Sequence, residues 1–551
     1  MTEVGRVLGH EDARPLAFWV GVAEDQYLQL DDVVAVTTPL PPDQEVNLYG
    51  IVDEVRARYE GDRFDSDVFR VVEGVLPVGV STSAHVSVTR IEPEVFIPPR
   101  PGQAVCRATA GQRDIALYFD RMTHRFPAGL SRDGQPIYAN LEFLDGTRGA
   151  HVNISGISGV ATKTTYALFL VYSLFRSGAL EAQAANTHAL VFNVKGEDLL
   201  WLDKPNSKLG DGDRAQYETL GLPAEPFADV GLWAPVVRHA GAALPDTGSR
   251  QAGVEAYYWT LREFCAERLL RFLFAEADTE ASQIAFVVTQ VERFLEAEER
   301  KQPKDRGWLE IFDQRVESFD DLVRFIEANL GSGIATSAAP GTQQAFARRL
   351  EAAAAHVGHL IRAVPPVEAE AHRIDWRARQ VSVIDIHNLH DRAKRFVVGV
   401  VIKRLMEDKE AMGRREPLVF LVLDELNKYA PREGWSPIKE VVLDIAERGR
   451  SLGVVLIGAQ QTASEIERRV AANASFRVAG RLDSAEAQRD EYGFLTAAAR
   501  ARAAILTPGS MFLHQPDLPV PLLVRFPFPA WATRRDEVAD EGGGAPMGFE
   551  P

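Results

Sequence analysis

Residues 156–164 read Gly-Ile-Ser-Gly-Val-Ala-Thr-Lys-Thr and lead into an apolar segment. Small residues allow backbone N–H groups to turn toward a phosphate, the lysine can reach the terminal phosphates, and the threonine hydroxyl can bind Mg²⁺. Lys163 and Thr164 stand where a helix is expected to begin, and the dipole of a helix N-terminus favours anions. The segment therefore predicts a phosphate-binding loop, whose nucleotide-binding candidates are Gly156, Gly159, Thr162, Lys163 and Thr164.

The spacing inside this loop is irregular. A regular loop has one glycine directly before the lysine and another about six positions before it, and this chain has Thr162 and Ile157 there. Counting from Gly156 makes the loop one residue too long. A Gly/Ser turn ahead of a core helix therefore remains an alternative for this segment taken alone, and we expect ATP affinity to be weaker than in a regular loop.

A second candidate element is the apolar run 418–423, which ends in Asp424 and Glu425. An acidic residue at the carboxyl end of a parallel strand lies where such sheets bind ligands. Asp424 can hold the shell of a Mg²⁺ ion, and Glu425 can orient and activate a water molecule. Capping of the following segment is the simpler alternative for this pair by itself.

The third element is the run 454–457 followed by Gly-Ala-Gln-Gln, where Gln460 could sense a γ-phosphate. Arg448 and Arg450 precede it at the end of a helix that starts near 437, where the helix dipole alone favours arginine. In a ring, such an arginine could also reach a neighbour's nucleotide as a finger. The order of the three elements predicts a nucleotide-hydrolysing core that uses ATP and Mg²⁺.

The elements that position these residues form an α/β pattern. Strands are expected at 151–154, 189–194, 381–386, 418–423 and 454–457, with helices at 164–175, at about 391–408 and from 437 onward. This order is typical of a parallel sheet. Residues 250–365 have helical periodicity instead, for example at 257, 261, 264, 265, 269, 272 and 273. We interpret them as a helical subdomain inserted into the α/β core.

Five segments follow from this pattern. The first hundred residues are expected to form short strands (17–22, 33–37, 46–52, 68–75 and 85–91), which suggests a small barrel ending at the stiff segment 98–102. The predicted ranges are an N-terminal β-barrel at 1–100, a RecA-like core at 101–245 and 371–530, the helical insertion at 246–370, and a disordered tail at 531–551.

Composition restricts the class of protein. The 551 residues include 61 basic and 78 acidic ones, a formal net charge of −17 that excludes a basic coat but not a local basic pore. The two cysteines, Cys106 and Cys265, fit neither a disulfide scaffold nor a metal site. The longest apolar stretch, 166–175, is about half of the ~20 residues that a membrane helix needs. We expect a cytoplasmic protein without a membrane partner.

These motifs resemble the HerA–FtsK superfamily of P-loop ATPases, and HerA within it. The resemblance rests on Lys163-Thr164, on Leu421-Val422-Leu423-Asp424-Glu425, on Glu447-Arg448-Gly449-Arg450 with Gly453, and on Gly458-Ala459-Gln460-Gln461. It implies an ATP-driven homo-hexameric DNA translocase or helicase that acts on double-stranded DNA. It also implies a nuclease partner, either NurA-like in end resection or an effector in anti-phage defence.

The resemblance implies a role for each matching residue. Lys163 binds phosphate, and Thr164 and Asp424 serve the metal. Glu425 serves the water and Gln460 the γ-phosphate. Arg450 is the candidate finger, and Arg148, just before the loop's strand, is a second candidate for reaching a phosphate across the interface.

Two alternatives to a motor stay open. One is a ring that binds nucleotide weakly and mainly assembles and activates an effector. The other is a phosphotransferase in which residues 250–365 form a substrate lid.

Overall fold

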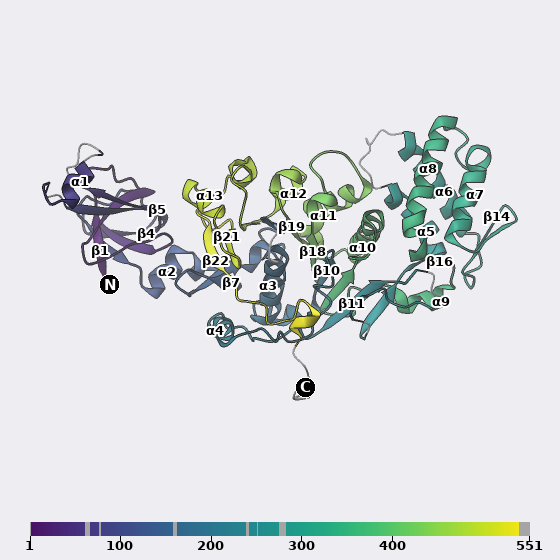
Figure 1. Cartoon of the computed structure of the whole chain (residues 1–551), viewed down its shortest axis with the longest axis horizontal. Coiled ribbons are helices and arrows are strands. Elements are labelled where there is room, and N and C mark those ends of the chain that lie inside the picture. Colours follow the sequence, from purple (N-terminus) through teal and green to yellow (C-terminus); the bar gives the residue numbers. More distant parts are fainter. Residues whose placement is uncertain are drawn as a thin grey trace, which may run out of the picture. The chain divides into compact units, whose positions relative to one another are not determined.

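The computed structural model describes residues 2–60, 65, 67–76, 79–157, 162–238, 242–250, 252–274 and 283–538. They form two compact units (Figure 1). Unit 1 comprises Met1–Leu141 and Phe476–Phe526, and unit 2 comprises Glu142–Ser475 and Pro527–Pro551. These bounds cut across the ranges expected for the two parts of the core. No helix in the described ranges is long and apolar enough to cross a membrane.

Unit 1 begins with the predicted barrel, which is closed and has the strand order β1-β2-β5-β4-β3-β6. The strands are β1 (Glu3–Val7), β2 (Ala17–Val22), β3 (Val33–Leu40), β4 (Gln44–Tyr59), β5 (Val80–Glu92) and β6 (Ala104–Arg107). Every neighbouring pair is antiparallel, and alternate side chains such as Val20, Val34 and Val86 fill the interior. Since β6 follows the stiff segment 98–102, the barrel extends past residue 100.

One predicted barrel strand is wrong. The predicted strand 68–75 overlaps the short helix α1 (Asp67–Val72), which lies between β4 and β5. Phe69 and Val72 are 70% and 77% exposed, so their apolar side chains do not face the barrel core. A short apolar run does not by itself distinguish a strand from a helix, and that ambiguity explains the error.

The rest of unit 1 is an antiparallel sheet that joins segments far apart in the chain. Its strand order is β20-β21-β22-β7-β8. The elements are β7 (Arg125–Leu130), β8 (Pro136–Asn140), β20 (Phe476–Ala479), β21 (Ser510–His514) and β22 (Leu522–Arg525), accompanied by helices α2 (Ala110–Ala116) and α13 (Ala497–Ala503).

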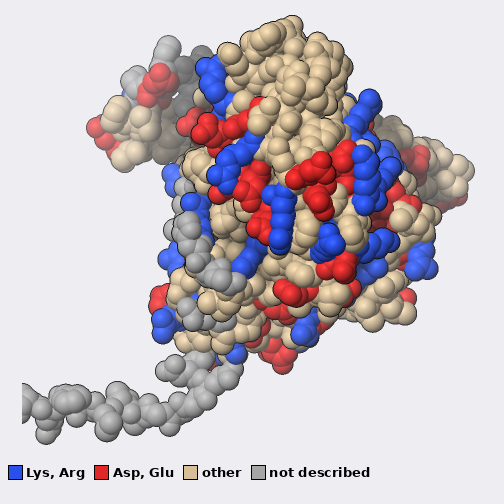
Figure 2. All heavy atoms as spheres, turned by 90° about the vertical axis from the view of Figure 1, so that its right-hand side faces the viewer, with Lys and Arg blue, Asp and Glu red and all other residues tan. Residues whose placement is uncertain are grey.

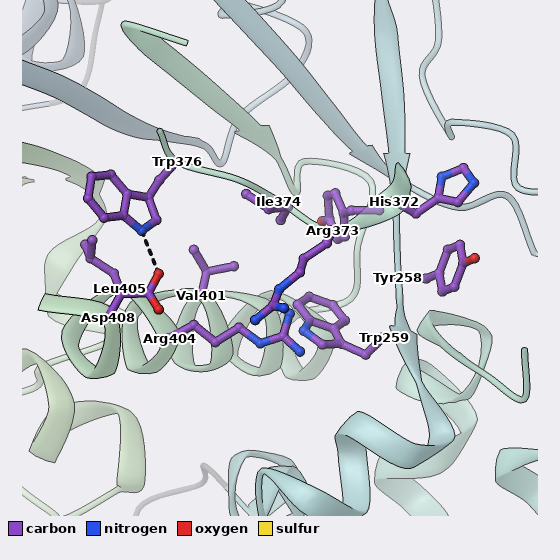
Figure 3. Close-up of a pocket in the computed structure, with 11 residues that line it drawn as sticks. Tyr258, Trp259, His372, Arg373, Ile374, Trp376, Val401, Arg404, Leu405 and Asp408 are labelled. Atoms are coloured by element: carbon purple, nitrogen blue, oxygen red, sulfur yellow. Dashed lines mark hydrogen bonds between the residues drawn. The ribbon is translucent and has the colours of Figure 1, made fainter. Parts of the chain in front are cut away.

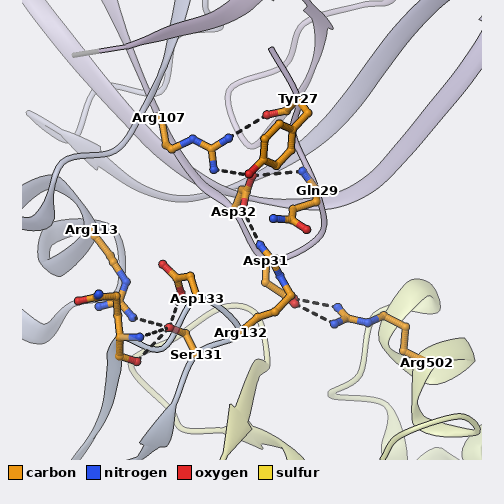
Figure 4. A network of polar contacts seen from close by, with 11 residues as sticks. Tyr27, Gln29, Asp31, Asp32, Arg107, Arg113, Ser131, Arg132, Asp133 and Arg502 are labelled. Atoms are coloured by element: carbon orange, nitrogen blue, oxygen red, sulfur yellow. Dashed lines mark hydrogen bonds and ion pairs between the residues drawn. The ribbon is translucent and has the colours of Figure 1, made fainter. Parts of the chain in front are cut away.

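A network of ion pairs ties the barrel to this sheet (Figure 4). Asp32, 7% exposed, accepts hydrogen bonds from Arg107 at 2.9 Å and Arg132 at 2.8 Å. Both oxygens of Asp31 accept from Arg502 on α13 at 2.8 Å. Burial raises the pKa of Asp32, although two guanidinium groups favour its charged form. A carboxylate this buried is destabilising unless paired, so the network fixes these segments together.

Unit 2 contains the predicted parallel sheet, with strand order β12-β11-β17-β10-β18-β19-β9. The strands are β9 (Val152–Ser155), β10 (Thr187–Asn193), β11 (Val230–Pro235), β12 (Val254–Tyr257), β17 (Val381–Asp385), β18 (Leu418–Asp424) and β19 (Val454–Gln460). Residues in β17, β18 and β19 are buried throughout, as expected for a parallel sheet covered on both faces. The predicted fold class, an α/β RecA-like core with an N-terminal barrel and a helical insertion, is confirmed.

Helices cover both faces of this sheet. Alternate strand residues, such as Leu421 and Leu456, share one core with α10 (Asp391–Met412) and α11 (Pro437–Leu452). Helix α3 (Thr162–Arg176) contacts β9, β18 and β19. Ser436 caps α11 by accepting from Lys439 N at 3.2 Å, and Gly453 ends it with φ +72°.

The helical insertion is present and packs on the α10 side of the sheet. It contains α5 (Leu261–Ala266), α6 (Gln283–Glu299), α7 (Phe319–Asn329), α8 (Pro340–Val357) and α9 (Pro366–Ala369), with the two-stranded sheets β13 (Trp259–Thr260)–β16 (Ile361–Arg362) and β14 (Leu309–Ile311)–β15 (Gln314–Val316). Figure 2 shows basic and acidic side chains interleaved over one face of the molecule. Less exposed ion pairs inside the insertion include Arg262–Glu299 and Arg271–Glu292.

The predicted tail begins too early in the sequence. Trp531 and Ala532 are fully buried in unit 2, and Asn206 donates to the Trp531 carbonyl at 3.2 Å. Residues 539–551 of the predicted tail lie outside the described residues.

Candidate nucleotide site

The carboxyl ends of four adjacent strands bring most of the predicted residues to one edge of the sheet. Strand β9 leads into the phosphate loop, β19 ends at Gln460, β18 ends at Asp424, and β10 ends at Asn193. The strand that carries Gln460 lies between the loop's strand and the strand that carries the acidic pair. This edge is where open parallel sheets bind ligands.

Lys163 and Thr164 lie in the first turn of α3. Lys163 is 5% exposed, and its Nζ donates to the carbonyl of Gly156 at 2.7 Å. Burial lowers the pKa of this lysine, although the nearby Asp424 favours its charged form. Ile157, where a regular loop has glycine, is 44% exposed. Gly159 and the side chain of Thr162 lie outside the described residues.

Thr164 connects this loop to the acidic pair. Its Oγ1 donates to Asp424 Oδ2 at 2.9 Å, across 260 positions of sequence. The other oxygen of Asp424 accepts from the backbone N–H of Glu425 at 2.8 Å. The predicted phosphate-loop threonine and the predicted metal carboxylate are therefore in direct contact.

Glu425 is held by its backbone and by two lysines. Its φ of +55° lies in the left-handed region, which is strained for a residue with a side chain and is found at functional sites. Lys428 lies 2.7 Å from Oε2, and Lys195 lies 3.2 Å from Oε1. Burial raises the pKa of Glu425, but the hydrogen bond from Lys428 and the charge of Lys195 outweigh it, so the pKa lies below its usual value.

Lys195 and the buried groups that hold its loop were not predicted from the sequence. Lys195 lies two residues beyond β10, so a charged residue after the strand adjacent to the acidic strand was the available signal. Asn193, the last residue of β10, donates to buried Asp385 at 2.8 Å. Asp385 also contacts His387 Nδ1, and that carboxylate raises the pKa of His387 against the effect of burial.

Gln460 is fully buried, and its Nε2 donates to Asn153 Oδ1 at 2.7 Å. The backbone N–H of Gly156 donates to the carbonyl of Gln460 at 3.2 Å, so the end of β19 is bonded to the start of the phosphate loop. The side chain of Gln460 thus bonds to the loop's own strand in this structure.

Arg450 and Arg148 lie at the opposite, amino edge of the sheet. Arg450, in the last turn of α11, donates to the carbonyls of Gly146 at 3.1 Å and Thr147 at 2.8 Å. The Arg148 guanidinium lies 3.6 Å from Glu142 and stacks over an adjacent phenylalanine ring. The structure therefore does not bring the two arginines to Lys163 and the acidic pair within one chain.

The oxygen ligands at the carboxyl edge fit Mg²⁺. Thr164 and Asp424 supply a hydroxyl and a carboxylate, which are hard donors that Mg²⁺ prefers. Among the described residues, no group of three or more His, Cys, Asp or Glu could hold a metal ion. A Mg²⁺ that arrives with a nucleotide needs only one or two carboxylates, because phosphates and waters complete its shell.

Unit 2 has another pocket, formed by β12–β13, the loop 372–376 and α10 (Figure 3). Aromatic rings line it, and the charged groups of Arg404 and Asp408 bond to residues nearby. Arg404 bridges Glu263 and Glu267, and Trp376 donates to Asp408 at 3.0 Å. We interpret this pocket as a junction between the sheet and the helical insertion.

No protein-family model matches the chain, and no curated protein matches it. One similar solved structure is VirB4 of Thermoanaerobacter pseudethanolicus, with 14% sequence identity over 73% of this chain and 96% of that chain and a TM-score of 0.43. A second is the plasmid coupling protein TrwB with an ATP analogue, with 13% identity over 79% of this chain and 96% of that chain and a TM-score of 0.45. A third is TrwB with ADP and Mg²⁺, with 12% identity over the same shares of the two chains and a TM-score of 0.44. At these identities and TM-scores, the likeness carries no information about the substrate of this chain.

Proposed function

We propose that this chain hydrolyses ATP at the carboxyl edge of its parallel sheet. The contact between Thr164 and Asp424 at 2.9 Å carries the proposal, because it joins a lysine–threonine helix start to an acidic strand end. Neither segment alone distinguishes a nucleotide site from a turn or a cap. Their direct contact is the arrangement that a Mg²⁺-dependent phosphate site requires.

Each residue at the carboxyl edge has a separate role in the proposed hydrolysis. Lys163 and the N–H groups at the start of α3 bind the phosphates, and Thr164 and Asp424 hold Mg²⁺, which neutralises charge developing on the phosphate oxygens. Glu425, next to Asp424 and ionised at neutral pH, orients the attacking water. Gln460 bonds to the loop's strand and would report the state of the phosphates through Gly156.

We further propose that the chain acts as a homo-hexamer. Arg450 lies on the amino edge, so it can complete a nucleotide site only when a neighbouring subunit presents that edge to the site. A P-loop NTPase can receive such a finger in trans from another protein, and the hexameric ring itself rests on the resemblance to the HerA–FtsK superfamily. Arg148, on the same edge, is the second candidate for this role.

Coupling of hydrolysis to translocation of double-stranded DNA rests on the resemblance to the HerA–FtsK superfamily. A nuclease partner, NurA-like or belonging to anti-phage defence, rests on the same resemblance. The interleaved charges in Figure 2 do not favour that face as the DNA-binding surface, because phosphates require clustered basic groups. We expect the DNA contacts in a local basic channel, which a net charge of −17 does not exclude.

A steady-state ATPase assay with and without linear duplex DNA tests the proposal. We expect Mg²⁺-dependent turnover that DNA stimulates and that is lost in the Glu425→Gln variant. Turnover that is equal in the variant and the parent protein would place the activity elsewhere. Turnover that DNA does not change would refute the motor while leaving the ATPase.

A nucleotide-binding ring that assembles an effector is the second candidate. It is favoured by the contact of Lys163 with the Gly156 carbonyl, which occupies the lysine inside its own loop, and by the exposed Ile157 in place of a glycine. It predicts stable rings and nucleotide binding with little turnover, whether or not DNA is present.

A further inference from the structure

The side chain of Lys195 contacts both members of the acidic pair, Asp424 and Glu425. Its Nζ lies 3.5 Å from Asp424 Oδ2 and 3.2 Å from Glu425 Oε1, so one ammonium group faces both carboxylates. Asp424 Oδ2 is also the oxygen that accepts from Thr164. A single positive charge thus stands beside the same oxygen that Mg²⁺ would approach in the proposed site.

Buried polar groups at the ends of β10 and β17 fix the loop that carries Lys195. Asn193 Nδ2 donates to the Gly196 carbonyl and to Asp385 Oδ1, both at 2.8 Å. Asn193 and Asp385 are 1% and 0% exposed, and the backbone of Gly196 has φ +53°. Buried, satisfied polar groups of this kind hold a loop in one conformation. Lys195 is therefore directed at the acidic pair by the sheet itself.

We propose that Lys195 is a positioning residue that takes the place of the metal cation at the acidic pair until Mg²⁺ arrives with the nucleotide. This inference rests on the proposed function. The ammonium contacts both carboxylates and so holds Asp424 and Glu425 close together in the nucleotide-free chain. Binding of Mg²⁺ then has to displace it, because two cations beside one carboxylate oxygen repel each other. Lys195 consequently weakens metal binding to the nucleotide-free chain.

Binding of Mn²⁺, a spectroscopic substitute for Mg²⁺, to the full-length nucleotide-free protein tests this inference by electron paramagnetic resonance. Lys195→Met removes the charge while keeping most of the side-chain length, and Lys195→Arg keeps the charge. Lys208→Met is a matched control, because Lys208 also bridges two consecutive carboxylates, Asp536 and Glu537, at similar exposure (50% against 46%). Thermal unfolding of each variant shows that the fold is retained.

We expect Lys195→Met to bind Mn²⁺ about two- to fivefold more tightly than the parent, the range expected from partly exposed charge pairs. Lys195→Arg and Lys208→Met should remain near the parent value, and Asp424→Asn should remove the gain. Equal Mn²⁺ binding by Lys195→Met and the parent, or no Mn²⁺ binding by either, would overturn the inference. Mn²⁺ binding is measured without turnover. A negative result for Lys195 can therefore be distinguished from failure of the ATPase proposal, which the turnover assay tests.

Discussion

Mixing the Arg450→Ala and Glu425→Gln variants, each expected to be inactive, tests whether Arg450 acts between subunits. Arg450 precedes β19, and Glu425 follows the adjacent strand at its other end. At about 3.3 Å per residue, the length of β19 separates the two edges by roughly 20 Å. No arginine side chain spans that distance, so Arg450 cannot reach the site of its own subunit in this conformation.

The size of the effect follows from the two roles that Arg450 can have. Loss of an arginine finger lowers kcat by about 10³- to 10⁵-fold. Loss of two exposed hydrogen bonds to Gly146 and Thr147 costs on the order of 1 kcal/mol each, so Arg450→Ala should still fold and assemble. In an equal mixture with Glu425→Gln, about one quarter of random interfaces combine an intact Arg450 with an intact Glu425.

The assay measures ATP turnover of each variant and of the mixture after subunit exchange, with native mass spectrometry to confirm mixed rings. We expect recovery of up to about one quarter of the parent turnover if sites work independently. Mixed rings no more active than the separate variants would refute the trans role and leave Arg450 as a tie between α11 and the loop before β9.

Three further outcomes are expected. Glu425→Gln should retain binding of a fluorescent ATP analogue while kcat falls by about 10²- to 10⁴-fold; loss of binding together with turnover would contradict a role limited to the water. Lys163→Ala should lower nucleotide affinity at least about tenfold in the same titration, and unchanged affinity would make the loop structural. Burial lowers the pKa of His151 from 6.5 to about 4. The folded chain therefore holds His151 neutral, and this contribution to the free energy of unfolding is complete above pH 6.5. As the pH falls toward 4, up to about 3 kcal/mol of the free energy of unfolding is lost. His151→Gln, whose amide can still accept from Leu456 N–H, should flatten the dependence of Tm on pH across this window, whereas an unchanged slope would show that other groups control it.

The parallel core could be predicted because its strands are continuous apolar runs that end in polar residues. The runs 418–423 and 454–457 correspond to the β18 and β19 strands, and the end of each carries a predicted residue of the site. Strands β11 and β12 escaped prediction because Gly231 and Glu255 interrupt their apolar pattern. The antiparallel sheet of unit 1 was missed because periodicity does not reveal pairing between segments as distant as β7 and β22.

The residues of the candidate site that lie in sequence motifs could be predicted, and those that depend on the sheet order could not. Residues inside motifs, such as Lys163, Thr164 and Asp424, come from short segments whose residue types are informative by themselves. Lys195 belongs to no motif, and its role depends on which strand lies beside β18, which only the sheet order reveals. The amino-edge position of Arg450 likewise depends on the packing of α11 and not on its spacing from Glu425.

The order of strand pairing in unit 1 has a consequence for how the chain folds during synthesis. The barrel closes when β6 pairs with β1, so it needs only the residues up to Arg107. Strand β7 must wait for β22, and at ribosomal rates the roughly 390 intervening residues take about 20 to 80 s. An unpaired edge invites pairing with the wrong partner, and prolines and glycines reduce that risk. Strand β7 contains both Pro127 and Gly129, which suits a strand whose edge opposite β8 remains unpaired until β22 leaves the ribosome.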